Sequence, residues 1–94
     1  MKIKDREFVL RDGALRFFLF RSMIEALENI GVEGGGIASV REQIAIAKQL
    51  EDATNGEADL SIEQLSLVRS LFERSSVIPV VKLALYDALD PPQE

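Results

Sequence analysis

Apolar residues recur at intervals of three and four along four segments of the chain, which predicts four amphipathic helices. The first segment covers residues 14–30, and Gly31 follows it as a natural C-terminal cap. The stripe predicted for this helix consists of Leu15, Phe18, Leu19, Met23, Ala26, Leu27 and Ile30. Phe17, Phe20 and Ile24 are apolar but lie off this stripe. The helix is therefore either the central helix of the fold or a helix that meets a partner.

The second and third helices are predicted from capping patterns as well as from periodicity. Ser39 precedes a helix expected over residues 40–53, and a Glu three residues later gives the spacing of a capping box. The apolar stripe of this helix is Val40, Ile44, Ala47 and Leu50. Ser61 precedes a helix expected over residues 62–74, and a Gln three residues later completes a second capping box. The apolar stripe of this third helix is Ile62, Leu65, Val68, Leu71 and Phe72.

The stretch SSVIPVV, residues 75–81, separates the third helix from a fourth. Serines are unfavourable inside helices, Pro79 suits the first turn of a helix, and the residue before a proline prefers extended backbone. We therefore expect the third helix to end near Arg74 and the fourth to cover residues 79–89. The angle between the two helices is expected to be fixed by three apolar residues: Val77, Ile78 and Val81.

The segment before the first helix is predicted to be extended. The apolar run at residues 8–10 favours a strand, and Asp12-Gly13 is a turn signal. These residues form either a β-hairpin or one extended segment that enters the first helix at Ala14. We favour the second arrangement, because residues 14–30 contain no further helix breaker.

The length of 94 residues is enough for one domain and too short for two. The predicted fold class is mostly α: a single compact four-helix domain with an extended N-terminal segment over residues 1–13, which forms a short β-strand or hairpin at most. Residues 90–94 are expected to fray.

Charge is distributed unevenly along this acidic chain, whose net charge is −5. Residues 1–22 hold six basic and three acidic groups, whereas residues 23–94 hold five basic and thirteen acidic groups. Such polarity suits a docking surface or head-to-tail association, and an unevenly charged solvated surface would give the same pattern.

The composition removes several kinds of chemistry. The chain has neither Cys nor His, which excludes thiol nucleophiles and removes the commonest general base and metal ligand. The Gly-rich loop at residues 31–36 follows a helix and lacks the Gly-Lys-Ser/Thr end of a phosphate-binding loop. The acidic loop at residues 51–59 lacks the full ligand set of a calcium loop. We therefore predict that the protein is not an enzyme and has no cofactor and no metal site.

Protein–protein interaction, with a partner protein or by self-association, is the function that this pattern favours. Aromatic and Arg side chains commonly anchor interfaces. The residues expected to bind the partner are Phe8, Phe17, Phe20 and Ile24, with Arg16 and Arg21 at the rim. One alternative is a nucleic-acid accessory protein that uses the basic, Phe-containing N-terminus, although the acidic total opposes it. The other is a carboxylate-dependent metal or hydrolytic site. A small-molecule ligand is not expected.

Three features stand at the two ends of the chain: a Met-Lys-Ile-Lys start at residues 1–4, a Leu-Ser-x-Glu helix start at residues 60–63, and the Pro-containing, Val-rich joint at residues 75–81. In these features the sequence resembles a group of small bacteriophage proteins. The resemblance implies a phage or prophage origin and a role in virion assembly or in binding a host protein, and it carries over no catalytic residues. The N-terminus lacks a signal-peptide pattern and the chain lacks an apolar run of membrane-spanning length, so we expect the host cytoplasm or the virion, without membrane contact.

Overall fold

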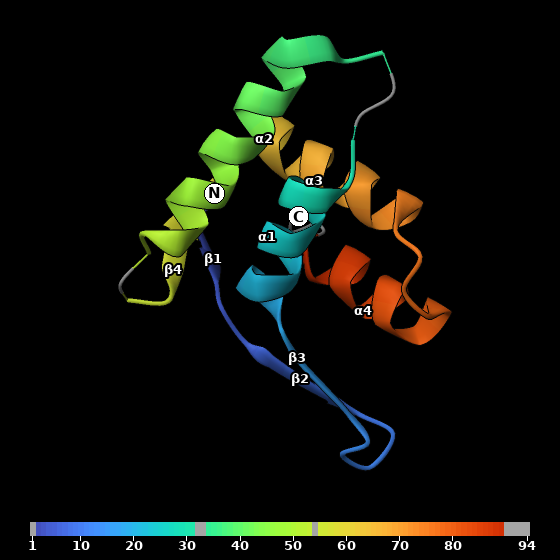
Figure 1. Ribbon diagram of the computed structural model, residues 1–94. Coiled ribbons are helices and arrows are strands. Elements are labelled where there is room, and N and C mark those ends of the chain that lie inside the picture. The colour runs from blue at the N-terminus through green and yellow to red at the C-terminus, as the bar shows by residue number, and fades with distance from the viewer. Residues whose placement is uncertain (1, 32–33, 54, 90–94) are drawn as a thin grey trace.

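The computed structural model describes residues 2–31, 34–53 and 55–89, and within them the elements follow in the order β1-β2-β3-α1-α2-β4-α3-α4 (Figure 1). The helices are α1, Leu19–Asn29; α2, Gly36–Glu51; α3, Ile62–Arg74; and α4, Pro79–Ala88. The strands are β1, Lys2–Lys4; β2, Glu7–Leu10; β3, Leu15–Phe18; and β4, Glu57–Asp59. The prediction of a mostly α fold with four helices is confirmed, with small antiparallel strands added to it. The tail predicted to fray, residues 90–94, lies outside the described residues.

The strands form two separate antiparallel pairs. β1 pairs with β4, so that Lys2 lies opposite Asp59 and Lys4 lies opposite Glu57. β2 pairs with β3 in a hairpin that extends away from the helices (Figure 1). Sequence analysis did not predict β4, because three residues, Glu-Ala-Asp, give no pattern of their own.

The expected entry into a helix at Ala14 is wrong, because residues 15–18 form strand β3 instead. Asp12 and Gly13 have positive φ angles of 55° and 91°, as the two central residues of a type I′ hairpin turn require. The Ala14 N–H donates to the Arg11 carbonyl oxygen at 3.1 Å and closes this turn. The hairpin alternative is thus the one that forms, since two chain segments rich in aromatic and aliphatic residues pair across a favourable turn.

Helix α1 lies at the centre of the fold and packs against α2 and α3. Its buried residues are Leu19, Phe20, Met23, Ala26 and Leu27. The predicted stripe is therefore confirmed from Leu19 to Leu27, whereas Leu15 and Phe18 belong to β3. Gly31 is not the C-terminal cap as predicted, because the helix ends at Asn29 and its C-cap residue is an extended Ile30.

Both ends of α1 are closed by side chains from elsewhere in the chain. The N-cap residue, Phe18, has no side-chain capping bond, and the Asp5 carboxylate accepts a hydrogen bond from the Phe20 N–H at 3.0 Å instead. At the other end, Gln43 Nε2 donates to the carbonyl oxygens of Leu27 at 3.1 Å and Ile30 at 2.7 Å. Gln43 is only 3% exposed.

Helix α2 begins earlier than predicted, and its predicted stripe is buried only at Ala47 and Leu50. It starts at Gly36, so Ser39 lies inside its first turns and does not cap it. Its buried residues are Gln43, Ile46, Ala47 and Leu50. Val40 and Ile44, expected in the core, are each 49% exposed. The helix carries apolar residues on two faces, so periodicity alone could not determine which face is buried.

Helices α3 and α4 begin and end close to the predicted residues, and the predicted stripe of α3 is buried except at Ile62, which is exposed in the first turn. Ser61 Oγ accepts a hydrogen bond from the Gln64 N–H at 3.1 Å, and Gln64 Oε1 accepts one from the Ser61 N–H at 2.9 Å. This is the predicted capping box. α3 ends at Arg74 as expected, and Pro79 occupies the first turn of α4. The stretch SSVIPVV is therefore a joint between two helices.

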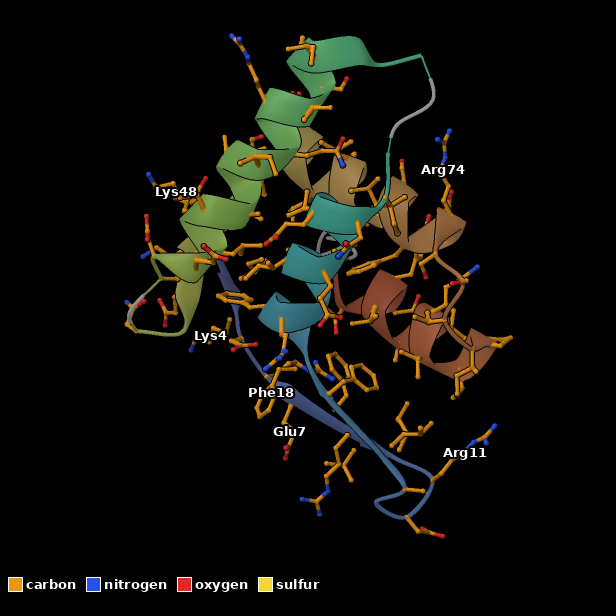
Figure 2. The ribbon with its side chains drawn as sticks, in the orientation of Figure 1. Lys4, Glu7, Arg11, Phe18, Lys48 and Arg74 are labelled. Atoms are coloured by element: carbon orange, nitrogen blue, oxygen red, sulfur yellow. The ribbon has the colours of Figure 1, made fainter. Side chains whose placement is uncertain are left out.

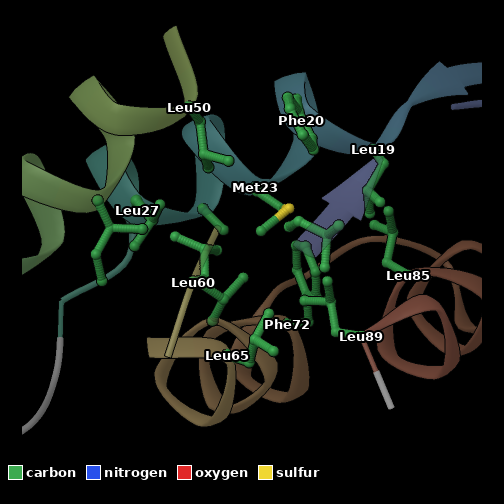
Figure 3. Close-up of a cluster of buried hydrophobic side chains, with 14 of the residues drawn as sticks. Leu19, Phe20, Met23, Leu27, Leu50, Leu60, Leu65, Phe72, Leu85 and Leu89 are labelled. Atoms are coloured by element: carbon green, nitrogen blue, oxygen red, sulfur yellow. The ribbon is translucent and has the colours of Figure 1, made fainter. Parts of the chain in front are cut away.

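One hydrophobic cluster unites the elements, and Figure 3 shows Met23 projecting from α1 into the middle of it. The largest fully buried side chains are Phe72, Met23, Leu27, Ile46, Leu60, Leu71, Leu89 and Val68. The Cα radius of gyration, 13.0 Å, is close to the value of about 12 Å for a compact chain of this length. In the described part of the chain, no helix is both long enough and apolar enough to span a membrane.

Candidate protein-binding groove

An open groove of about 530 Å³ runs between α1 and the corner formed by α3, residues 75–78 and α4. On the α1 side it is lined by Ser22, Glu25, Ala26, Asn29 and Ile30. These residues are spaced by three and four and so share one face of the helix. The groove therefore follows the helix axis over about two turns.

The opposite wall is the helix joint that the sequence singled out. Arg74, Ser75, Ser76 and Val77 line it together with Val81 and Leu85 of α4, and Phe72 lies at the base. The Ser75 hydroxyl oxygen is buried and has no hydrogen-bond partner among the described residues. An unpaired buried hydroxyl is unfavourable unless something else bonds to it.

Polar contacts bridge the two helices at the joint, and only one of the three predicted apolar contacts forms. Lys82 Nζ donates to the Glu73 carbonyl oxygen at 3.0 Å, and the Arg69 guanidinium lies 4.1 Å from the centre of the Tyr86 ring. Val77 and Ile78 stay 42% and 43% exposed and are not buried between the helices. Of the three predicted contacts, only Val81 packs against the core.

Apolar surface extends beyond the groove onto α4. Val80 is 38% exposed and Leu83 is 61% exposed, while Leu85 is the buried residue of this helix. A helix that is apolar around most of its circumference is normally covered on more than one side. In the described structure α4 packs mainly on α3, so its outer side remains open to solvent.

The six residues predicted to bind a partner do not form one surface. Phe8 and Phe20 are buried, at 6% and 5% exposure, and are core residues rather than surface anchors. Ile24 is half-buried against the core. Phe17 lines the groove, and its ring stacks on Phe8 with the centroids 4.9 Å apart.

The two predicted rim arginines lie in different places. Arg21 is exposed and its Nε lies 3.7 Å from Glu25 Oε1, which places it beside the α1 wall of the groove. Arg16 pairs with Val9 across the hairpin and is exposed. Its face of the hairpin also carries Glu7 and Phe18, which Figure 2 shows pointing away from the helices. The structure thus brings Phe17 and Arg21 to the groove and leaves Arg16 outside it.

Sequence reasoning missed the α4 side of the groove. The signal was present, because residues 77–85 include Val77, Val80, Val81, Leu83 and Leu85, more apolar residues than one buried stripe needs. The predicted first helix has a similar excess of apolar residues, and most of these residues are buried or half-buried against the core.

The groove has the character of a binding surface. Its floor is apolar. Its polar groups are of several kinds and include Glu25, Arg74 and the serines. In the residues that the structure describes, no three acidic side chains gather closely enough to hold a metal ion. No protein-family model, curated protein or solved structure matched this chain.

Proposed function

We propose that this protein is a non-catalytic protein–protein interaction module that binds an apolar helical segment of a partner between α1 and the α3–α4 joint. The observation that carries the proposal is the open apolar groove, which continues into exposed apolar residues at Val77, Ile78 and Leu83. Exposed apolar surface that borders a hollow is typical of interaction sites.

The shape of the groove suits one face of an amphipathic helix. A volume of about 530 Å³ has room for a few large side chains, which a helix supplies at intervals of three and four residues. Each large apolar side chain buried there contributes about 1.5 to 3 kcal/mol, from which the cost of association is subtracted. Glu25 on one wall and Arg74 on the other favour a partner with a basic residue facing α1 and an acidic residue facing the joint.

The phage resemblance suggests where such a partner would come from. A virion protein or a host cytoplasmic protein would supply the helix, and the module would act in assembly or by binding to the host protein. The phage origin of the protein and its place in the host cytoplasm or the virion are part of this proposal. The proposed binding mechanism rests on the groove alone.

A displayed library of amphipathic helical peptides tests the groove directly. Peptides selected on the immobilised protein should bind it in calorimetry and should lose at least tenfold in affinity for Val77→Glu or Ser22→Arg, which place charge or bulk in the groove. Ile62→Glu is the matched control, because Ile62 is 64% exposed at the start of α3 and lies outside the groove. Selection of no binders, or peptides that bind both groove variants as tightly as they bind the wild type, would contradict the proposal.

Nucleic-acid binding is the second candidate, and the geometry of the hairpin favours it. Arg11 and Arg16 are exposed on the hairpin, and Phe18 is 48% exposed. Arg6 is exposed just before the hairpin, with its guanidinium 4.2 Å from the centre of the Phe8 ring. Figure 2 shows Arg11 at the far end of the hairpin. A two-stranded ribbon fits the major groove of DNA, and an exposed aromatic ring stacks on unpaired bases. Binding to oligonucleotides should then fall steeply with salt and with Arg11→Glu, and absence of binding at low salt would dismiss this candidate.

A further inference from the structure

The outward face of helix α2 is apolar although it takes no part in the core. Ile37 is 67% exposed, and Val40 and Ile44 are each 49% exposed. The buried residues of α2 are Gln43, Ile46, Ala47 and Leu50, so the exposed stripe borders the buried face and its continuation at Ala47 is part of the core. Folding of a single chain therefore does not explain why three β-branched apolar residues lie in this position.

The spacing of the three residues matches the seam of a coiled coil. Ile37, Val40 and Ile44 are separated by three and then four residues, as the a, d and a positions of a heptad are. β-Branched residues at a positions are typical of parallel two-stranded coiled coils with Leu at d, and here the d position is the smaller, β-branched Val40. The seam is short, because the next a position is Glu51 and the next d position, Ala47, is buried in the core.

The two sides of this stripe carry opposite charge. Arg41 and Lys48, four residues after Ile37 and Ile44, lie along one side of it. Along the other side a hollow of about 130 Å³ separates α2 from the end of α1, and its lining includes Glu28, Val40 and Ile44. Two copies related by a twofold axis parallel to α2 bring the acidic side of one copy against the basic side of the other. An antiparallel arrangement would bring like charges together, Arg41 beside Arg41 and Glu28 beside Glu28.

We propose that two copies of this chain associate through their α2 helices in parallel, with Ile37, Val40 and Ile44 in the seam and Glu28 facing the partner's Arg41. The hollow beside Val40 and Ile44 receives a side chain of the second copy, as the holes of a coiled coil receive knobs. The contact spans about two helical turns, less than a standard interface, so the association is weak and depends on concentration. It uses a surface outside the groove and does not depend on the proposed partner.

Sedimentation velocity over a range of concentrations tests the self-association. The wild-type chain should shift from monomer toward dimer as concentration rises, and Ile37→Glu and Ile44→Glu should each keep it monomeric. Leu83→Glu is the matched control, because Leu83 is similarly exposed, at 61%, on α4. Circular dichroism confirms that each variant is folded. A wild-type chain that stays monomeric at millimolar concentration, or dimers that both α2 variants leave intact, would overturn the proposal.

The orientation has a test of its own. Arg41→Glu should weaken the dimer, and the double change Glu28→Arg with Arg41→Glu should restore it. Because the chain has no cysteine, single changes Ile37→Cys and Ile44→Cys report the arrangement by disulfide formation. Parallel helices let both single variants crosslink to themselves. An antiparallel pair would crosslink efficiently only when the two variants are mixed, and that result would exclude the parallel arrangement.

Discussion

Helices α1 and α3 are similar in length but are closed at their ends in different ways. α3 is capped by Ser61 and Gln64, which stand three residues apart in the sequence. α1 is capped at its N-terminus by Asp5, fifteen residues from Phe20, and at its C-terminus by Gln43, sixteen and thirteen residues from the two carbonyl groups that it bonds. The capping of α3 is a property of a short sequence, whereas that of α1 is a property of the folded chain.

This difference explains which boundaries the sequence predicts. Local signals gave the start of α3, the joint and the start of α4, because each depends on neighbouring residues. The start of α1 had no such signal, since its N-cap is a phenylalanine. Helix α1 can begin at Leu19 because β2 and β3 pair and bring Asp5 close to Phe20. Four substitutions test this contrast, and they are given in order of decreasing effect.

Gln43→Glu should have the largest effect, a loss of about 3 kcal/mol in the free energy of unfolding at neutral pH. It replaces a buried donor with a carboxylate that faces the carbonyl oxygens of Leu27 and Ile30. Burial and these oxygens would raise the pKa of the introduced carboxyl group in the folded state above its unfolded value. The loss in the free energy of unfolding is therefore complete above the pKa that the introduced carboxyl group has in the folded state. This loss shrinks as the pH falls toward about 4.

Chemical denaturation of this variant and of the wild type at several pH values measures the effect. Gln49→Glu is the control: Gln49 Nε2 donates to the Asp59 carbonyl oxygen at 2.6 Å, but the site is exposed and water replaces the bond. A similar loss in both variants would mean that Gln43 has no special role at the end of α1.

Asp5→Ala should lower the free energy of unfolding by about 1 to 2 kcal/mol, because the Phe20 N–H loses its acceptor and the helix dipole loses a compensating charge. Asp5→Asn keeps an acceptor and should lose less. Glu7→Ala removes an exposed carboxylate from the adjacent strand and serves as the control. Equal stability of Asp5→Ala and Glu7→Ala would show that the long-range cap contributes nothing measurable.

Ser61→Ala should cost about 1 kcal/mol through loss of the local cap of α3. Gln64→Ala should cost less, and the double variant should cost less than the sum, since the two residues act as one capping box. Thermal or urea unfolding of the two single variants and the double variant checks this. Additive losses would argue against the reciprocal arrangement.

Arg11→Gly should raise stability by about 0.5 to 1 kcal/mol, the smallest of the four effects. Arg11 has a φ of 53°, which glycine adopts without the steric cost that a Cβ brings. The change would strengthen the turn of the hairpin on which the Asp5 cap depends. Arg11→Ala removes the same charge but keeps a Cβ. If unfolding measurements show an equal rise in the free energy of unfolding for Ala and for Gly, the gain comes from the loss of charge instead.

The residues predicted to bind a partner do not share one surface, for a related reason. Phe8, Phe17 and Phe20 look alike in the sequence, and each was expected to face a partner. The hairpin buries Phe8 and leaves Phe17 at the groove, and the first turn of α1 buries Phe20. On α2, by contrast, an apolar stripe expected in the core is exposed at Val40 and Ile44. Hydrophobicity indicates that a residue is to be covered, but which surface covers it depends on contacts between distant segments.

The pairing of β1 with β4 has a consequence for how the chain folds. It joins residues that lie more than fifty positions apart, while every helix forms from neighbouring residues. Closing so long a loop costs entropy that three facing residue pairs and the burial of Ile3 and Ala58 offset, and this burial needs the rest of the core, so the pair should form after the helices have packed. Substitutions in β1, such as Ile3→Val, should then speed unfolding and leave the rate of folding nearly unchanged. The first strand of the sequence would be the last part of the fold to assemble.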